Sequence, residues 1–155
     1  MLGCARRPRR SADRRAVLAG LPGEHHSLGL TAFGVVLQDL GWSITFLGRD
    51  VPVAAVRKAA DAVHADAIVL AAVMPESIAA AVDDLTALME THSVVVGGPA
   101  ADRDACALPA PRLLRPDLVG AARALTLATP AAQPGLGPDR AGARAPQPGS
   151  LSARA

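Results

Sequence analysis

Aromatic residues are scarce in this 155-residue chain, making up 2% of the sequence: Phe33, Trp42 and Phe46, with no tyrosine. A surface that stacks nucleic-acid bases or sugars on aromatic rings is therefore nearly excluded. The two cysteines form no CxxC pair and cannot build a disulfide framework. No apolar run reaches the roughly 20 residues that cross a bilayer, and no secretory signal is evident. We therefore expect a cytoplasmic location and no membrane association.

Charge is unevenly distributed, although the whole chain carries a formal net charge of only +2. Residues 1–15 carry a net charge of +5 and residues 130–155 a net charge of +2, whereas residues 16–129 carry −5. The calculated isoelectric point of about 8.9 therefore reflects the two ends of the chain. Because clustered arginines without a docking fold give only non-specific attraction to nucleic acid, we do not expect this chain to bind DNA by itself.

Composition divides the chain into three parts. Residues 1–14 are predicted to be a flexible Arg-rich N-terminal tail, and residues 15–129 one folded domain. Residues 130–155 contain nine Pro or Gly residues and no hydrophobic periodicity, which predicts a disordered Pro/Gly/Ala-rich tail. Half of the whole chain is hydrophobic, which suffices for the core of one such domain.

Short apolar runs alternate with segments of helical periodicity in the predicted domain. This alternation predicts an α/β fold: a flavodoxin-like (Rossmann-like) doubly wound five-stranded parallel sheet, in the order 2-1-3-4-5. Ligands of such sheets bind beyond the carboxyl ends of the strands. The expected strands are 16–20, 43–47, 67–71, 93–96 and 112–114, and the expected helices are 27–40, 52–64, 75–90, 102–108 and 117–127.

The loop after the first predicted strand contains two imidazoles and a carboxylate, with no GxGxxG or GxxxxGK[ST] pattern that would indicate a nucleotide site. The spacing of Glu24 and His26 lets the carboxylate accept a hydrogen bond from one ring nitrogen while the other nitrogen points outward. One imidazole is too little for zinc, which takes three or four protein ligands. It is enough for a metal whose equatorial ligands come from a macrocycle.

The segment Glu24-x-His26-x-x-Gly29 resembles the D/E-x-H-x-x-G signature of cobalamin-binding domains. The family's Gly-Gly pair after the fourth strand is matched by Gly97-Gly98. Its S-x-L or S-x-T at the end of the third strand is replaced here by Ala71-Ala72-Val73. The resemblance covers roughly residues 15–127.

Two further segments also resemble the family: Gly41-Trp42, and Leu47-Gly48-x-Asp50-Val51-Pro52. The glutamate at position 24, preceded by Pro22-Gly23, is most similar to the cobalamin domains of MerR-type light-responsive transcriptional regulators.

The resemblance implies that cobalamin binds in the base-off/His-on mode, with His26 as the lower axial ligand of cobalt and Glu24 as its hydrogen-bond partner. Gly29 and Gly97-Gly98 would then make room for the nucleotide tail of an adenosylcobalamin or methylcobalamin. No catalytic residue is implied. The implied cofactor-binding residues are Gly23, Glu24, His26, Ser27, Leu28, Gly29, Ala71, Ala72, Val73, Gly97, Gly98 and Pro99.

Ala71 departs from the family pattern, because it stands where relatives have a serine that meets the buried benzimidazole. Losing one neutral hydrogen bond costs about 1 kcal/mol. We therefore expect weaker but not abolished cobalamin binding, and tighter binding in an Ala71→Ser variant.

These features favour a stand-alone sensor or cofactor-handling module that is not itself an enzyme. Regulators of the resembled type carry a DNA-binding helix-turn-helix and a helical bundle over the upper corrin face. Only about 15 residues precede the first predicted strand here, so we expect both parts to be absent and a partner protein to cap that face. The alternatives are a corrinoid carrier subunit of a methyltransferase system and a degenerate, truncated domain with little cofactor affinity.

Overall fold

A computed structural model of the chain describes residues 14–104, 112–113 and 117–130. In these ranges a parallel sheet runs in the order β2-β1-β3-β4, and a two-residue β5 extends it beyond β4. The predicted α/β class with a parallel sheet is thus confirmed in its four longer strands, whereas Leu114 of the predicted fifth strand lies outside the described residues. The strands are β1 (Arg14–Gly20), β2 (Trp42–Gly48), β3 (Ala67–Ala71), β4 (Val94–Gly97) and β5 (Arg112–Leu113).

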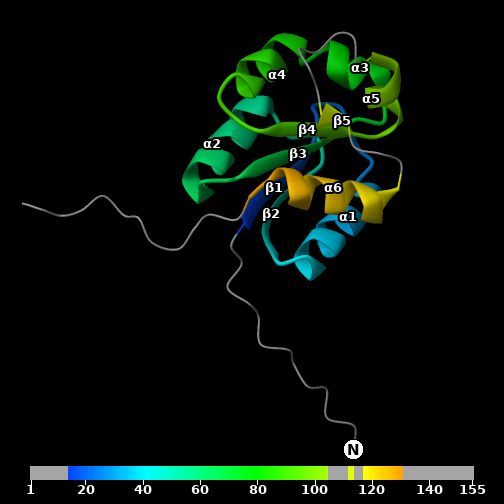
Figure 1. Ribbon diagram of the computed structural model, residues 1–155. Helices are drawn as coiled ribbons and strands as arrows, with labels where there is room; N and C mark the ends of the chain where they lie inside the picture. Colours follow the sequence, from blue (N-terminus) through cyan, green and yellow to red (C-terminus); the bar gives the residue numbers. More distant parts are fainter. Residues whose placement is uncertain (1–13, 105–111, 114–116, 131–155) are drawn as a thin grey trace, which may run out of the picture.

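Helices cover both faces of the sheet, as Figure 1 shows: α1 and α6 lie on one face, and α2 to α5 lie on the other. Among the residues that the structure describes, none of these helices has the length and apolar character that crossing a bilayer requires. Their bounds are α1 (Leu28–Asp39), α2 (Val53–Val63), α3 (Pro75–Ala79), α4 (Val82–Met89), α5 (Pro99–Asp104) and α6 (Leu118–Ala128).

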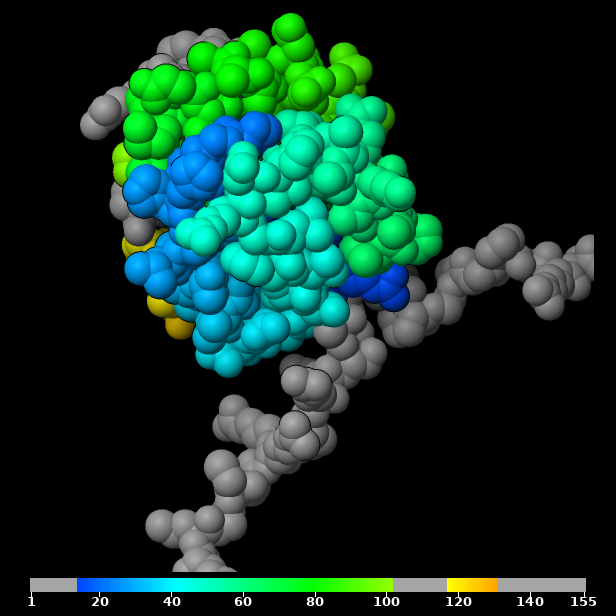
Figure 2. All heavy atoms as spheres, turned by 180° about the vertical axis from the view of Figure 1, so that it is seen from behind, coloured from blue at the N-terminus to red at the C-terminus, as the bar shows by residue number. Residues whose placement is uncertain are grey.

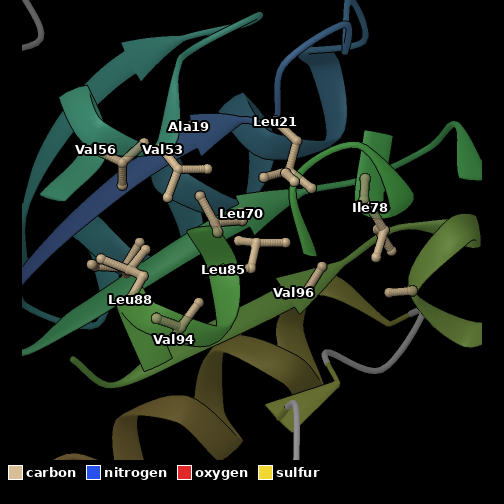
Figure 3. Close-up of a cluster of buried hydrophobic side chains, with 14 of the residues drawn as sticks. Ala19, Leu21, Val53, Val56, Leu70, Ile78, Leu85, Leu88, Val94 and Val96 are labelled. Carbon is tan, nitrogen blue, oxygen red and sulfur yellow. The ribbon is translucent and has the colours of Figure 1, made fainter. Parts of the chain in front are cut away.

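Strand β3 shows why the sheet is buried on both faces. Successive side chains of a strand point to opposite faces, so a strand covered on both sides is apolar throughout. Ile68 and Leu70 pack toward α2 and α4, whereas Val69 packs toward α1 and α6. Figure 3 shows the first of these layers, in which Leu70 of the sheet and Leu85 of α4 point toward one another.

The predicted helix 75–90 is wrong as a single helix, because the structure breaks it into α3 and α4. At the break the amide of Ala81 bonds to the carbonyl of Ile78, which tightens the last turn to three-residue spacing. Ile78 and Ala81 are thereby both buried in the core of this face. No Gly or Pro marks the break, so the hydrophobic pattern alone could not reveal it.

The other predicted boundaries are accurate to a few residues where the structure describes them. Helix α5 begins at Pro99, three residues before the predicted start, and residues 105–108 of that prediction lie outside the described ranges. The predicted N-cap Asp117 is confirmed, since its carboxylate accepts hydrogen bonds from the amides of Val119 and Gly120. The predicted tails lie outside the described residues, apart from Arg14, the first residue of β1, and Pro130.

Candidate functional site

The loop between β1 and α1 buries a carboxylate beside an imidazole at the carboxyl edge of the sheet. Glu24 is fully buried and accepts four hydrogen bonds. Its Oε1 accepts from the backbone amide of His26 at 3.0 Å and from Nδ1 of the same residue at 2.6 Å. Its Oε2 accepts from the amides of Val73 at 2.6 Å and Met74 at 3.1 Å. The carboxylate therefore joins the loop after β1 to the loop after β3.

These hydrogen bonds decide the ionisation of Glu24. Burial by itself would raise the pKa of the carboxyl group, because it penalises the charged form. The bonds from His26, Val73 and Met74 outweigh burial and lower the pKa of Glu24 from 4.5 to about 2. Glu24 is therefore an anion at neutral pH, and its oxygens can only accept hydrogen bonds.

The anion fixes the tautomer of His26. Since a carboxylate cannot donate, Nδ1 of His26 must carry the proton in the 2.6 Å bond, and Nε2 of a neutral ring then keeps a free lone pair. The side chain is 62% exposed, so this nitrogen is open to a ligand. Within the described residues no group of three or more His, Cys, Asp or Glu side chains gathers as a metal site. A metal held here would need its other ligands from elsewhere.

A second loop braces the one that bears Glu24 and His26. Asp50, after β2, accepts a hydrogen bond from the amide of Gly23 at 2.8 Å and donates its own amide to the carbonyl of Glu24 at 2.9 Å. Asp50 adopts a left-handed φ of 54°, which Asp and Asn tolerate better than most residues. On the molecular surface the blue segment after β1 adjoins the cyan segment after β2 (Figure 2).

A cavity of about 380 Å³ opens beside His26, on the face of the sheet that α1 and α6 cover. The helices contribute Leu30, Phe33, Leu118 and Ala121 to its lining, in addition to Gly29. Strand β3 contributes Val69, Leu70 and Ala71, and the loop after it contributes Val73. The end of β4 contributes Gly97, which Gly98 and Pro99 follow. Its volume lies in the range typical of small-molecule sites, and its walls are mostly apolar.

Two glycines of this cavity have different reasons to be glycine. Gly98 has a φ of 117°, and a Cβ on it would collide with the carbonyl oxygen of Ala72. The fold itself therefore requires Gly98. A Cβ on Gly29 would meet no atom within 4 Å beyond its chain neighbours and the nearby backbone of α1, so nothing else in the fold excludes a side chain there. Gly29 leaves open space beside His26 that a ligand could use.

The structure brings seven of the twelve predicted binding residues together around the cavity: His26, Gly29, Ala71, Val73, Gly97, Gly98 and Pro99. Glu24 does not line the cavity and acts through His26. Gly23 lies beside Asp50, and Leu28 is 87% exposed. The backbone carbonyl of Ser27 bonds to Thr31, inside α1. Ala72 is fully buried in the core on the other face.

Sequence reasoning missed six lining residues: Leu30, Phe33, Val69, Leu70, Leu118 and Ala121. Leu30 and Phe33 have helical spacing and were recognisable only as core. The signal that could have found Val69 is the strand period, because it shares a face with Ala71 and Val73. Leu118 and Ala121 follow only from the tertiary position of α6.

Comparison with known proteins matches residues 14–109 to the family described as B12 binding domain. The chain is 39% identical over 90 residues to the HTH-type transcriptional repressor CarA of Myxococcus xanthus. That match covers 56% of this chain and 31% of the repressor, so the chain spans about a third of that relative's length.

Three solved structures share the fold. A cobalamin-binding protein from Desulfitobacterium hafniense DCB-2 gives a TM-score of 0.61 at 22% identity, covering 74% of this chain and 58% of that one. The monomethylamine corrinoid protein of Methanosarcina barkeri gives 0.63 at 20% identity, covering 75% and 58%. The methanol:cobalamin methyltransferase complex MtaBC of the same organism gives 0.64 at 20% identity, covering 81% and 49%.

The brace at Asp50 generates a first prediction. Asp50→Ala removes the acceptor for the amide of Gly23 and places alanine at a left-handed φ. Urea unfolding should therefore show a free energy of unfolding that is lower than wild type by about 1–2 kcal/mol. Asp50→Asn keeps an oxygen acceptor and tolerates that φ, and it should stay within about 0.5 kcal/mol of wild type. Equal losses in the two variants would contradict this role for Asp50.

The ionisation of Glu24 generates a second prediction. Because its pKa is lower in the folded state than in the unfolded state, its contribution to stability is fully present above pH 4.5 and is lost as the pH falls toward 2. The loss should approach about 3 kcal/mol at the acid end. Urea unfolding at several pH values should show this slope in wild type and a clearly smaller slope in Glu24→Gln.

The matched control is Glu76→Gln, which removes an exposed carboxylate of α3 and should keep the wild-type pH dependence. A Glu24→Gln variant with the same acid sensitivity as wild type would show that other groups dominate the acid unfolding.

Proposed function

This chain belongs to the B12-binding domain family, and we propose on that premise that it binds cobalamin in the base-off/His-on mode, with His26 as the lower axial ligand of cobalt. The cavity beside His26 would then hold the cofactor's own dimethylbenzimidazole, released from the metal. A bound cobalamin supplies a cobalt centre whose upper axial group can be sensed or exchanged. The chain's residues bind and orient it.

The observation that carries this proposal is the bond between the buried Glu24 and the exposed ring of His26. The 2.6 Å contact holds the proton on Nδ1 and directs the lone pair to Nε2, which is the form an imidazole needs to ligate a metal. Partners of this kind also raise the basicity of the ligating ring and fix its orientation. A single such imidazole suits a metal that a corrin ring already surrounds.

The cavity fits the tail of the same cofactor. It lies beside His26 and has apolar walls. It is open at Gly29, because glycine has no side chain to fill the space there. An apolar cavity suits the flat hydrocarbon edge of a dimethylbenzimidazole. The cavity would hold the nucleotide tail, so its lining would not select between an adenosyl and a methyl upper group.

We assign the domain to sensing or cofactor handling because its 39%-identical relative is a transcriptional repressor. Exposed apolar side chains at the same edge of the sheet offer a surface that a bound corrin or a partner protein would cover. Leu28 is 87% exposed, Met74 is 44% exposed and Leu118 is 37% exposed. The fold shared with a monomethylamine corrinoid protein and with a methanol:cobalamin methyltransferase complex keeps the carrier role as the second candidate.

Cobalamin binding and its dependence on His26 form a third prediction. Purified protein mixed with hydroxocobalamin and separated from free cofactor by gel filtration should stay coloured, with a base-off, His-on visible spectrum. His26→Ala should lose that spectrum because it lacks the nitrogen ligand. His25→Ala is the matched control, since it removes the neighbouring exposed imidazole and should keep the wild-type spectrum.

Colourless wild-type protein would leave the degenerate-domain hypothesis and overturn the proposed function. Equal spectra in the two histidine variants would show that a group other than His26 ligates the cobalt.

A fourth prediction is that a side chain at position 29 weakens cobalamin binding without lowering the free energy of unfolding. Gly29→Leu should leave the free energy of unfolding unchanged or raise it by up to about 1 kcal/mol, because leucine favours helices more than glycine does. It should weaken cobalamin binding tenfold or more, because the side chain enters the open space of the cavity. Tenfold in affinity corresponds to about 1.4 kcal/mol of binding free energy. Absorbance titration and urea unfolding measure the two effects.

Ala32→Leu is the control on the same helix, at an exposed position outside the cavity lining. It should change neither affinity nor spectrum. If Gly29→Leu bound cobalamin as tightly as Ala32→Leu, the space at Gly29 would have no part in binding.

A further inference from the structure

The side chains around the cavity carry almost no hydrogen-bonding groups. Of the described residues that line it, only His26 has a polar side chain, and that ring is already held by Glu24. The remaining lining side chains are hydrocarbon or absent, as at Gly29, Gly97 and Gly98. A group that enters the cavity therefore meets no side-chain donor or acceptor other than this imidazole.

Such walls discriminate between ligands by the number of polar atoms that each ligand would bury without a hydrogen-bond partner. A polar group buried without a partner loses its hydrogen bonds to water and gains none in return. Corrinoids differ in the lower base of their nucleotide tail. A purine base carries several ring nitrogens and can carry an exocyclic amine, a benzimidazole has one free ring nitrogen once it leaves cobalt, and a phenol-type base has no ring nitrogen.

Ala71 occupies the position where a polar wall atom would matter. It is the last residue of β3, is half-buried, lines the cavity, and pairs in register with Gly20 on one side and Gly97 on the other. Since both neighbours are glycines, this level of the sheet has no side-chain polar atom. A hydroxyl at position 71 would add a side-chain donor to a described wall whose one polar side chain, His26, is already held by Glu24.

We propose that the cavity selects among corrinoids by their lower base, favouring benzimidazole or phenol-type bases over purines, and that Ala71 contributes by offering no hydroxyl to a base nitrogen. The inference rests on the proposed function and adds the chemical class of corrinoid that the domain accepts. Hydrophobic pockets reject an added polar group only modestly, so the discrimination against a purine should be about 10- to 100-fold in affinity.

The test is an absorbance titration of wild type and Ala71→Ser with three cobamides that carry adenine, dimethylbenzimidazole or p-cresol as the lower base. The cost of releasing the base from cobalt belongs to the free corrinoid, so it cancels when one cobamide is compared between two proteins. Ala71→Ser should bind the two nitrogen-containing forms about fivefold more tightly than wild type does, the value of one hydrogen bond, and should bind the cresol form unchanged.

Ala54→Ser introduces the same hydroxyl at an exposed position of α2 and should leave all three affinities unchanged. The inference is wrong if wild type binds the adenine form as tightly as the dimethylbenzimidazole form once the measured base-on/base-off equilibrium of each free cobamide is subtracted, a comparison that needs no variant. It is also wrong if Ala71→Ser shifts all three affinities equally. In both cases cobalamin is still bound and the proposed function stands. If none of the three cobamides binds to wild type, the proposed function fails, and the selectivity fails with it.

Discussion

Glu24 connects three separate parts of the chain through its carboxylate and its backbone carbonyl. Of the charged side chains that the structure describes, it is the only one that is fully buried. Removing an ion from water costs several kcal/mol unless hydrogen bonds replace its hydration. The replacements come from His26 on its own loop and from Val73 and Met74 after β3, while Asp50 after β2 holds the backbone of Glu24 itself. The charge is therefore tolerable only when all three loops are in place.

This arrangement links the imidazole to the cavity wall. The amide of Val73 donates to Glu24, and the side chain of Val73 lines the cavity. Ala71, two residues earlier, lines the same wall and has its carbonyl bonded to the amide of Leu21 in the Glu24 loop. A displacement of the end of β3 would therefore leave a buried anion unpaired and would also move His26. One interaction consequently fixes both the metal-ligating nitrogen and the space beside it.

Much of this could be predicted from sequence because the signals are local. The apolar run of β3, the helical spacing of α1 and the Glu24–His26 separation each depend on neighbours within a few residues. The hydrogen bonds from Val73 and Met74 to Glu24 join residues 49 and 50 positions apart, and no local pattern encodes them. The break between α3 and α4 was missed for a related reason, because burial of Ile78 and Ala81 determines it and no Gly or Pro announces it. Ala72 illustrates the strand period, since one step along the chain moves it from the cavity face to the opposite core.

The two faces of the sheet differ in how far they are filled. The face under α2 and α4 is packed with large aliphatic side chains such as Leu70, Leu85 and Leu88, which are fully buried. At the carboxyl edge of the other face several wall positions are small, among them Ala71, Gly97 and Ala121. Protein interiors are close-packed, so a stretch of small residues facing two helices leaves space that the chain does not fill. The packed face can supply the stability of the domain without constraining this space. Small residues in the cavity wall can therefore change with the ligand, whereas Glu24, Gly98 and the paired strands are held by the fold itself.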